Sequence, residues 1–148
     1  MNLINEMKLS FISKSCNESF SRTCIAAFIA KLDPSVSELA EIKTALSEAV
    51  TNCIVHAYRG CEGTIEISAK AYEDKTIIIK IKDKGCGIPD TQKAMTPLFT
   101  TAPEEERAGL GFAVMESFMD KITVKSIVGK GTTVTMKRKI LSSECDCT

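Results

Sequence analysis

The sequence predicts one domain with a two-layer α/β (α+β) architecture, in which a mixed β-sheet is covered on one face by helices. The chain has 148 residues, a usual length for a single domain with its own core. Two segments near the middle alternate between apolar and polar residues, whereas two segments before them repeat with the helical period. One side of the predicted sheet is therefore apolar, and the amphipathic helices cover it. We expect one domain over residues 1–148, with a disordered tail over 142–148.

The first strand is predicted from an imperfect alternation between Met7 and Ile12. Ser15 and Glu18 then have the spacing of a capping box and predict the start of a helix. This helix stops at Asp33, because the residue before a proline is disfavoured in the α region. Its predicted apolar face consists of Phe20, Cys24, Ala27, Phe28 and Leu32.

A second helix is expected from Ser35 to Tyr58, and Ser35 and Glu38 repeat the capping spacing. Its predicted apolar face consists of Val36, Leu39, Ile42, Leu46, Val50, Cys53, Ile54 and Ala57. Glu48 and Asn52 lie one turn apart on the opposite side. Taken alone, such a polar stripe is typical of a face turned to solvent, so its spacing does not by itself define a site.

Four further strands complete the predicted sheet pattern. The clearest are 64–71 and 76–82, which are separated by a connection short enough for a hairpin. The last two cover 121–127 and 132–139, with Gly129 and Gly131 between them.

The connection after the third predicted strand is unusually long. From Asp90 to Ala108 the chain contains two prolines and an acidic run, and it predicts an irregular segment of the kind that is generally functional. Gly109 and Gly111 then precede an apolar helix over 112–119. Glycines before a helix N-terminus expose backbone N–H groups, which favour phosphate.

Composition limits the partners and the compartment. Nineteen Lys and Arg balance nineteen Asp and Glu, which argues against broad electrostatic binding, so no direct nucleic-acid partner and no membrane partner are expected. The seven cysteines are odd in number and scattered, which favours a reducing, cytoplasmic location. The chain also lacks the P-loop motif and the usual protein-kinase motifs, so any ATP site must have another architecture.

Four short motifs occur in the order found in the GHKL ATPases and kinases, which include DNA gyrase and the histidine kinases. They are Glu48-x-x-x-Asn52, Asp83-x-Gly85-x-Gly87, Gly109-x-Gly111 and Gly129-x-Gly131-Thr132-Thr133. From about residue 7 to 140 the chain also resembles the anti-sigma F factors of spore-forming bacteria, through stretches such as PLFTT and AGLGFAVMESFMD. The resemblance implies the GHKL (Bergerat-type) fold.

The resemblance also implies roles for single residues. Glu48 is the general base that accepts the proton of a substrate serine, Asn52 binds Mg²⁺, and Asp83 accepts a hydrogen bond from the adenine amino group. The other implied nucleotide contacts are Gly85 and Gly87 beside the base, Gly109, Gly111 and Arg107 at the phosphates, and Thr132 or Thr133 at the adenine. Arg22 matches a partner-contacting arginine, and the segment from 90 to 108 matches the ATP lid. Cys53, next to Asn52, is expected to pack as a buried thiol.

The implied function is that of an anti-sigma factor and serine-protein kinase. Such a protein uses ATP and Mg²⁺ to phosphorylate a serine of an anti-anti-sigma factor, and as a homodimer it holds the sporulation sigma factor F inactive. In the ADP form it binds the unphosphorylated antagonist and releases the sigma factor.

Three alternatives stay open at the level of sequence. A general-stress anti-sigma kinase of the same family would keep every motif. A nucleotide-gated sigma-binding module without kinase activity would not need the carboxylate of Glu48. The catalytic domain of a histidine kinase would need a phosphoacceptor-histidine helix pair, whereas the one histidine, His56, lies in the motif helix.

Overall fold

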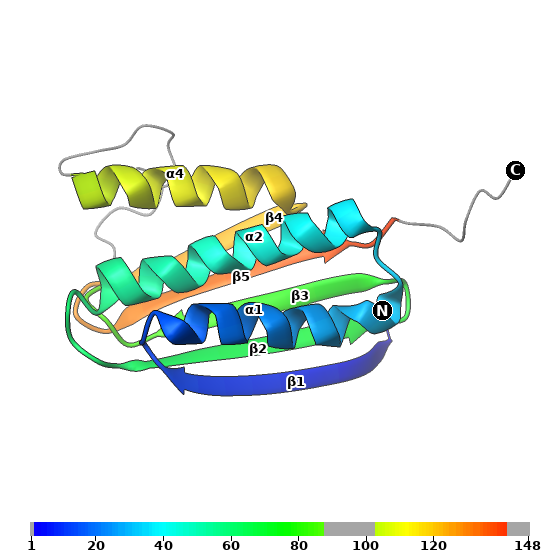
Figure 1. Ribbon diagram of the computed structural model, residues 1–148, viewed down its shortest axis with the longest axis horizontal. Coiled ribbons are helices and arrows are strands. Elements are labelled where there is room, and N and C mark those ends of the chain that lie inside the picture. The colour runs from blue at the N-terminus through cyan, green and yellow to red at the C-terminus, as the bar shows by residue number, and fades with distance from the viewer. Residues whose placement is uncertain (1, 88–102, 142–148) are drawn as a thin grey trace, which may run out of the picture.

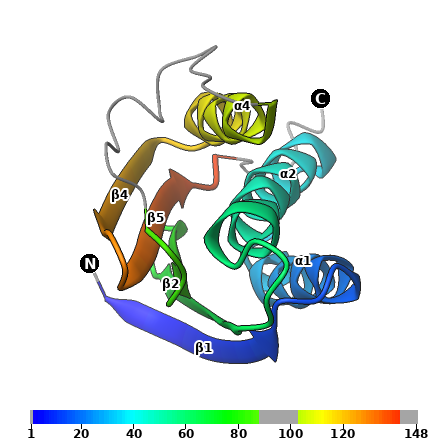
Figure 2. The same cartoon turned by 90° about the vertical axis from the view of Figure 1, so that its left-hand side faces the viewer.

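The computed structural model describes residues 2–87 and 103–141, with the side chains of 103–110 left out. Within these residues five strands form one sheet in the order β1-β2-β3-β5-β4, and the helices lie on one of its faces (Figures 1 and 2). The predicted two-layer α+β architecture is therefore confirmed. The elements are β1 (Leu3–Ile12), α1 (Cys16–Ile29), a 3₁₀ turn (Ala30–Leu32), α2 (Val36–Asn52), a π-helical turn (Cys53–Ala57), β2 (Thr64–Tyr72), β3 (Thr76–Asp83), α4 (Pro103–Phe118), β4 (Lys121–Ile127) and β5 (Gly131–Lys139).

The expectation of a mixed sheet is wrong, because every strand pairing among the described residues is antiparallel. Two helices, not one, connect β1 to β2, so the chain returns to the end where β1 finishes and β2 runs in the opposite direction. Helix α4 lies between β3 and β4 in the chain and is the one helix described there, and these two strands do run in the same direction. They do not pair, since β5 lies between them.

Helix α2 begins as the sequence predicts. The Ser35 hydroxyl accepts a hydrogen bond from Glu38 N at 3.0 Å, and Glu38 Oε1 accepts one from Ser35 N at 2.9 Å. The other carboxylate oxygen of Glu38 accepts a hydrogen bond from Leu141 N at 2.7 Å, which attaches the end of the sheet to the start of α2. Ile42, Leu46, Val50 and Cys53 are buried as expected. The prediction that Val36 is a core residue is wrong, because Val36 is 87% exposed in the first turn, before the helix reaches the sheet.

Helix α1 is present, but its predicted cap is wrong and its predicted face is only partly right. Of that face, Leu32 is buried in the following 3₁₀ turn and Phe28 packs partly buried against the core. Ser15 has helical backbone angles and its side chain makes no capping hydrogen bond, whereas an N-cap residue normally has extended angles. The buried positions are Ser21, Ile25 and Ile29. Phe20 is 50% exposed. Two apolar stripes lie side by side on this helix, and the one with the β-branched residues packs into the core.

Helix α4 begins at Pro103, so the expectation of irregular structure is wrong for residues 103–108. Proline is favoured in the first turn of a helix, and the acidic residues that follow it complement the positive end of the helix dipole. Gly109 and Gly111 consequently lie inside α4 and not before it. The rest of the predicted lid, 90–102, and the predicted tail, 142–148, lie outside the described residues.

The core lies between α2 and the inner face of the sheet. The alternating residues Ile65, Ile67, Ile77, Ile79 and Ile81 are almost completely buried there, and the predicted hairpin between β2 and β3 is confirmed. Arg138 on β5 donates to Glu41 Oε2 at 2.6 Å and to the Phe118 carbonyl oxygen at 2.7 Å, so one side chain connects the sheet to α2 and to the end of α4. In the described residues, none of the helices is both long enough and apolar enough to cross a membrane.

Candidate functional site

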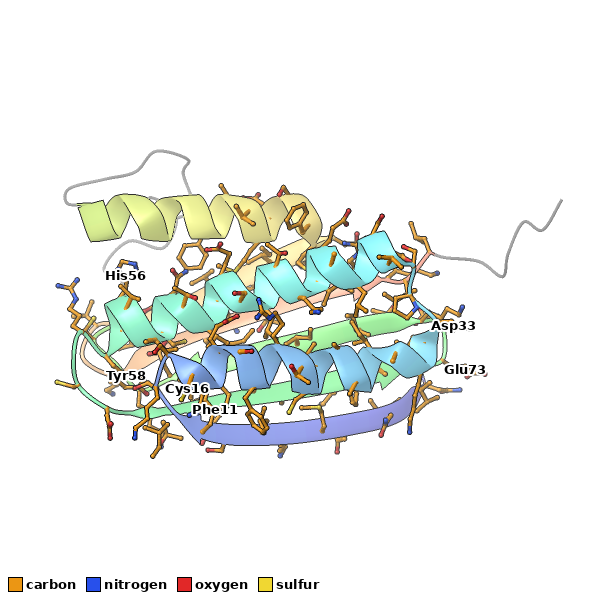
Figure 3. The ribbon with its side chains drawn as sticks, viewed as in Figure 1. Phe11, Cys16, Asp33, His56, Tyr58 and Glu73 are labelled. Atoms are coloured by element: carbon orange, nitrogen blue, oxygen red, sulfur yellow. The ribbon has the colours of Figure 1, made fainter. Side chains whose placement is uncertain are left out.

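Three motif segments that are far apart in sequence meet at one end of the sheet. They are the C-terminal end of α2 with its π turn, the end of β3, and the β4–β5 turn (Figure 1). We call this region, together with Gly111 of α4, which lies against the end of α2, the motif corner (residues 48–58, 83–87, 111 and 126–132). Cys86 N donates to the Ala57 carbonyl oxygen at 3.0 Å, and Gly129 N donates to the Cys86 carbonyl oxygen at 2.8 Å. Figure 3 shows His56 and Tyr58 at this end of α2. Backbone hydrogen bonds thus hold the three segments together.

Asp83 ends β3 and is 5% exposed. Its Oδ1 atom accepts hydrogen bonds from Gly85 N at 2.9 Å and from Thr132 N at 3.2 Å. Its Oδ2 atom accepts one from the Cys53 thiol at 3.5 Å. An ionised carboxylate can accept about four hydrogen bonds, so the carboxylate is held by the protein and still has capacity for a ligand donor.

Cys53 is buried, which confirms its expected packing role. Burial, reinforced by the Asp83 charge, raises the pKa of the Cys53 thiol well above its usual range, so the sulfur keeps its hydrogen and acts as a donor. The motif spacings alone do not predict this contact. A signal for it exists: Asp83 continues the alternation of Ile79 and Ile81, and the inner face of the sheet is turned toward α2.

Gly85 and Gly87 are needed because other parts of the backbone approach them closely. A Cβ atom at Gly85 would overlap the Ala57 carbonyl group. At Gly87, which has φ +78°, a Cβ atom would lie 2.5 Å from the Ile127 carbonyl oxygen. The absence of side chains thus lets the segment after β3 pack between the π turn and β4. Their implied role beside an adenine ring stays a prediction.

Glu48 and Asn52 point from α2 toward Gly111 of α4. A Cβ atom at Gly111 would lie 3.0 Å from Glu48 Oε2 and 3.4 Å from both the nitrogen and the oxygen of the Asn52 carboxamide. Both side chains are half-buried, so this part of the polar stripe faces the neighbouring helix and not open solvent. The structure therefore brings Glu48, Asn52 and Gly111 together.

The electrostatics of this part of the corner are unusual for a helix surface. Burial raises the pKa of the Glu48 carboxyl, and the charge of Glu18 on α1 raises it further. Asn52 Nδ2 is buried and has no hydrogen-bond partner in the described part of the chain. An unpartnered N–H₂ donor beside a glycine fits a ligand acceptor such as a phosphate oxygen. The oxygen of the same carboxamide is of the type that suits Mg²⁺, which commonly takes one or two protein ligands plus phosphate oxygens and water.

The two threonines of the last motif face opposite sides of the sheet. Thr132 is buried, its N–H donates to Asp83, and its hydroxyl lies 2.8 Å from the Ser126 hydroxyl. Thr133 pairs with the exposed Lys82 and Lys125 on the face without helices. The structure thus brings Thr132, but not Thr133, to the motif corner.

The remaining predicted residues lie on α4 and α1. Residues 107 and 109 are within the helical part of α4, so the N–H groups of Gly109 and Gly111 are inside a helix and not at its N-terminus. The side chain of Arg107 is outside the described set. Arg22 is on α1, partly exposed, with Nη1 3.8 Å from Glu18 Oε1.

Comparisons with known proteins identify the fold and the family. A family model described as a histidine kinase-like ATPase domain matches residues 19–138. A solved structure of the RsbU and RsbW domains of a Mycobacterium tuberculosis protein has a TM-score of 0.68 at 18% identity, with 93% of this chain and 33% of that one covered. The chain thus spans a third of that protein. A histidine kinase domain from Erythrobacter litoralis has a TM-score of 0.56 at 16% identity, with 83% and 61% covered. The fold and the matched model define the class, a kinase-like ATPase domain, which binds ATP and ADP.

Curated relatives identify the family within this class of ATPase domains. An anti-sigma F factor from Caldanaerobacter subterraneus subsp. tengcongensis is 58% identical over 136 residues, which cover 92% of this chain and 94% of the relative. Anti-sigma F factors from Geobacillus kaustophilus and Clostridium novyi are each 50% identical, over 97% and 95% of this chain and 98% of each relative. The chain belongs to the anti-sigma F factor family.

Proposed function

We propose that this protein is a Mg²⁺-dependent protein-serine kinase that binds and inhibits sigma factor F and is opposed by an anti-anti-sigma factor. The observation that supports the proposal is the convergence of Glu48 and Asn52 on Gly111, together with the buried carboxylate of Asp83, which is hydrogen-bonded to the residue after Asn52. One end of α2 would then supply both a base and a metal ligand. A module that only bound nucleotide would need neither the raised pKa nor the position of Glu48.

The nucleotide would lie along the motif corner. Asp83 Oδ2 would accept a hydrogen bond from the adenine amino group, and Thr132, whose N–H already holds the same carboxylate, would line the base. Asn52 would bind Mg²⁺ through its amide oxygen. The metal would supply charge neutralisation at the phosphates.

Phosphoryl transfer would use Glu48 as general base. The substrate serine oxygen forms a bond to the γ-phosphorus, the bond from that phosphorus to the bridging oxygen of ADP breaks, and the serine proton moves to the Glu48 carboxylate. Burial helps because a carboxylate with a raised pKa holds a proton better near neutral pH. The rest of the catalysis is positioning, which the rigid α2 provides.

Phosphate binding by the N–H groups of Gly109 and Gly111 would require the first turns of α4 to unwind, because these groups lie inside the helix. Each interior glycine lowers helix stability by about 1 kcal/mol relative to alanine. Two glycines in one turn therefore lower the free energy needed to unwind this part of α4. Arg107 would join the same phosphate contacts or contact the partner.

Partner binding is proposed for α1 and β1. Arg22 and the exposed Phe20 are both on α1, where they offer a charge and an apolar contact to the sigma factor and the antagonist. β1 is an edge strand, and Leu3, Ile4 and Ile12 on it are exposed, which supports a homodimer through this edge. We place the protein in the cytoplasm.

The direct test is incubation with ATP labelled at the γ-phosphate and a candidate anti-anti-sigma protein, followed by mapping of the labelled residue. We expect label on one serine of the antagonist, and none with the Glu48→Gln variant. Absence of label on the antagonist, or label on His56 of the chain itself, would reject the serine-kinase proposal.

A further inference from the structure

We propose that Cys53 is a positioning residue for adenine recognition, whose thiol orients Oδ2 of Asp83 toward the 6-amino group of the base. This inference rests on the proposed nucleotide site and adds a residue to it. It starts from the hydrogen bond between two buried side chains, the Cys53 thiol and Asp83 Oδ2, at 3.5 Å.

The two oxygens of Asp83 are held in different ways. Oδ1 accepts from two backbone N–H groups, which belong to the segment after β3 and to the start of β5. Oδ2 accepts from Cys53, and no other donor to this atom occurs among the described residues. Backbone groups therefore fix one end of the carboxylate, and a single side chain fixes the direction of the other end.

The thiol leaves Oδ2 able to act as an acceptor. A carboxylate oxygen has two lone-pair directions, so the hydrogen bond from Cys53 occupies one and the second stays open to a ligand N–H. Without the thiol, the carboxylate can rotate while Oδ1 keeps its two hydrogen bonds, or a water molecule can donate to Oδ2 in place of the thiol. Either change moves the open lone pair away from the purine amino group.

Because the Asp83 carboxylate is buried, its third hydrogen-bond donor, the Cys53 thiol, is important. The residue Asp83 is 5% exposed, and in the described part of the chain its carboxylate forms no ion pair with a lysine or arginine. Neutral hydrogen-bond donors alone stabilise it, and a buried carboxylate is unfavourable unless such donors are present. Cys53 supplies one of the three, at the end of the carboxylate that would face the base.

The position of Cys53 suits this task. Cys53 is the first residue of the π turn, and its carbonyl oxygen accepts a hydrogen bond from Tyr58 N at 3.1 Å. This bond holds the backbone of the turn independently of the thiol. π turns of this kind are common at functional sites, where they re-aim side chains. A side-chain change at Cys53 should therefore alter the donor without unwinding the turn.

The experiment compares direct binding titrations of ATP and inosine triphosphate, which has a carbonyl in place of the 6-amino group. We expect the unchanged protein to prefer ATP. In Cys53→Ala, ATP affinity should fall about fivefold, the loss of one ordinary hydrogen bond, with inosine triphosphate affinity unchanged. Cys53→Ser, which keeps a donor, should restore the preference. Cys86→Ala is the matched control, since Cys86 is an exposed thiol of the same corner whose hydrogen bonds go to carbonyl oxygens.

The outcomes separate this inference from the proposed function. An unchanged ATP preference in Cys53→Ala, or an equal loss for both nucleotides, overturns the positioning role alone. No preference for ATP in the unchanged protein overturns the adenine contact of Asp83 as well. If Cys53→Ala does not fold, Cys53→Val, which has the bulk but no donor, takes its place against Cys53→Ser.

Discussion

The two halves of the motif corner differ in how their polar groups are satisfied. In the base half, formed by Asp83, Cys53 and Thr132, the buried carboxylate has three donors, two of which are backbone N–H groups. In the phosphate half, formed by Glu48, Asn52 and Gly111, the buried amide nitrogen of Asn52 has no partner in the described residues, and burial raises the pKa of Glu48.

The difference follows from the elements that build each half. Strand ends and a turn form the base half, and their backbone hydrogen bonds fix it before any ligand binds. Two packed helices form the phosphate half, and one of them carries glycines in its interior. We therefore expect the base half to determine which nucleotide binds, and the phosphate half to determine what happens to it.

The largest effect should come from Glu48→Gln in the phosphate half. Loss of a general base typically lowers a rate about 10²- to 10⁴-fold, so phosphoryl transfer should be abolished in practice. ATP affinity should stay close to that of the unchanged protein, because glutamine has nearly the same shape. Labelled-phosphate transfer and a separate nucleotide titration check the two parts. Unchanged transfer would remove Glu48 from the role of base.

The pH dependence of transfer has a defined sign. Glu48 acts as a base only when it is ionised, and burial raises its pKa, so the transfer rate should fall as the pH decreases through that raised pKa. The midpoint of the acid limb of the rate profile should therefore lie at a higher pH than the pKa of an ordinary glutamate. A profile without this limb would show that Glu48 ionisation does not limit transfer.

The next effect in size is expected for Asp83→Asn in the base half. The substitution replaces one acceptor oxygen by an N–H₂ donor, which opposes both the Cys53 thiol and the adenine amino group. Hydrogen bonds to charged groups contribute about 1.5–3 kcal/mol, so ATP affinity should fall roughly 10- to 100-fold. Adenosine, which lacks the phosphates, should lose affinity by the same factor. Normal nucleotide affinity in a direct titration would contradict the adenine contact.

Gly111→Ala should separate the halves with a smaller effect. The new methyl group would lie 3.0 Å from Glu48 Oε2, so we expect ATP affinity to fall about tenfold while adenosine affinity is unchanged. Alanine favours a helix over glycine by about 1 kcal/mol, so thermal stability should not fall. Equal losses for adenosine and ATP would show that the two halves are not independent.

The smallest effect on nucleotide binding and stability is expected for Arg22→Ala, which lies outside both halves. Its ion pair with Glu18 is partly exposed, and such pairs contribute about 0–1 kcal/mol. Binding of the sigma factor and of the antagonist should weaken, with ATP affinity unchanged. Pull-downs that match the unchanged protein for both partners would exclude Arg22 from the interface.

Local signals predict the elements better than they predict contacts between them. The capping box at Ser35 and the alternation in β2 and β3 are short-range patterns, and the structure confirms both. The face of α1 is predicted only in part, because two apolar stripes are adjacent in sequence and only packing selects between them. The start of α4 is missed because glycine suggests a helix boundary, although Pro103 and the acids after it are equally good start signals.

The same limit applies to the site. The spacing of Glu48 and Asn52 predicts a shared face but not that Gly111 lies opposite, since this depends on how α4 packs on α2. The hydrogen bond from Cys53 to Asp83 joins residues that are thirty positions apart. Thr133 is the opposite case: it belongs to the sequence motif, but its side chain lies on the face of the sheet without helices, away from the site.

The hydrogen bond from Leu141 to Glu38 has a practical consequence. It brings Leu141, the last described residue, beside the first turn of α2, at the opposite end of that helix from Glu48 and Asn52. An affinity tag or fluorophore joined directly after Leu141 would therefore start at the end of α2 opposite the proposed nucleotide site. Attachment at this position should leave titrations with nucleotides undisturbed.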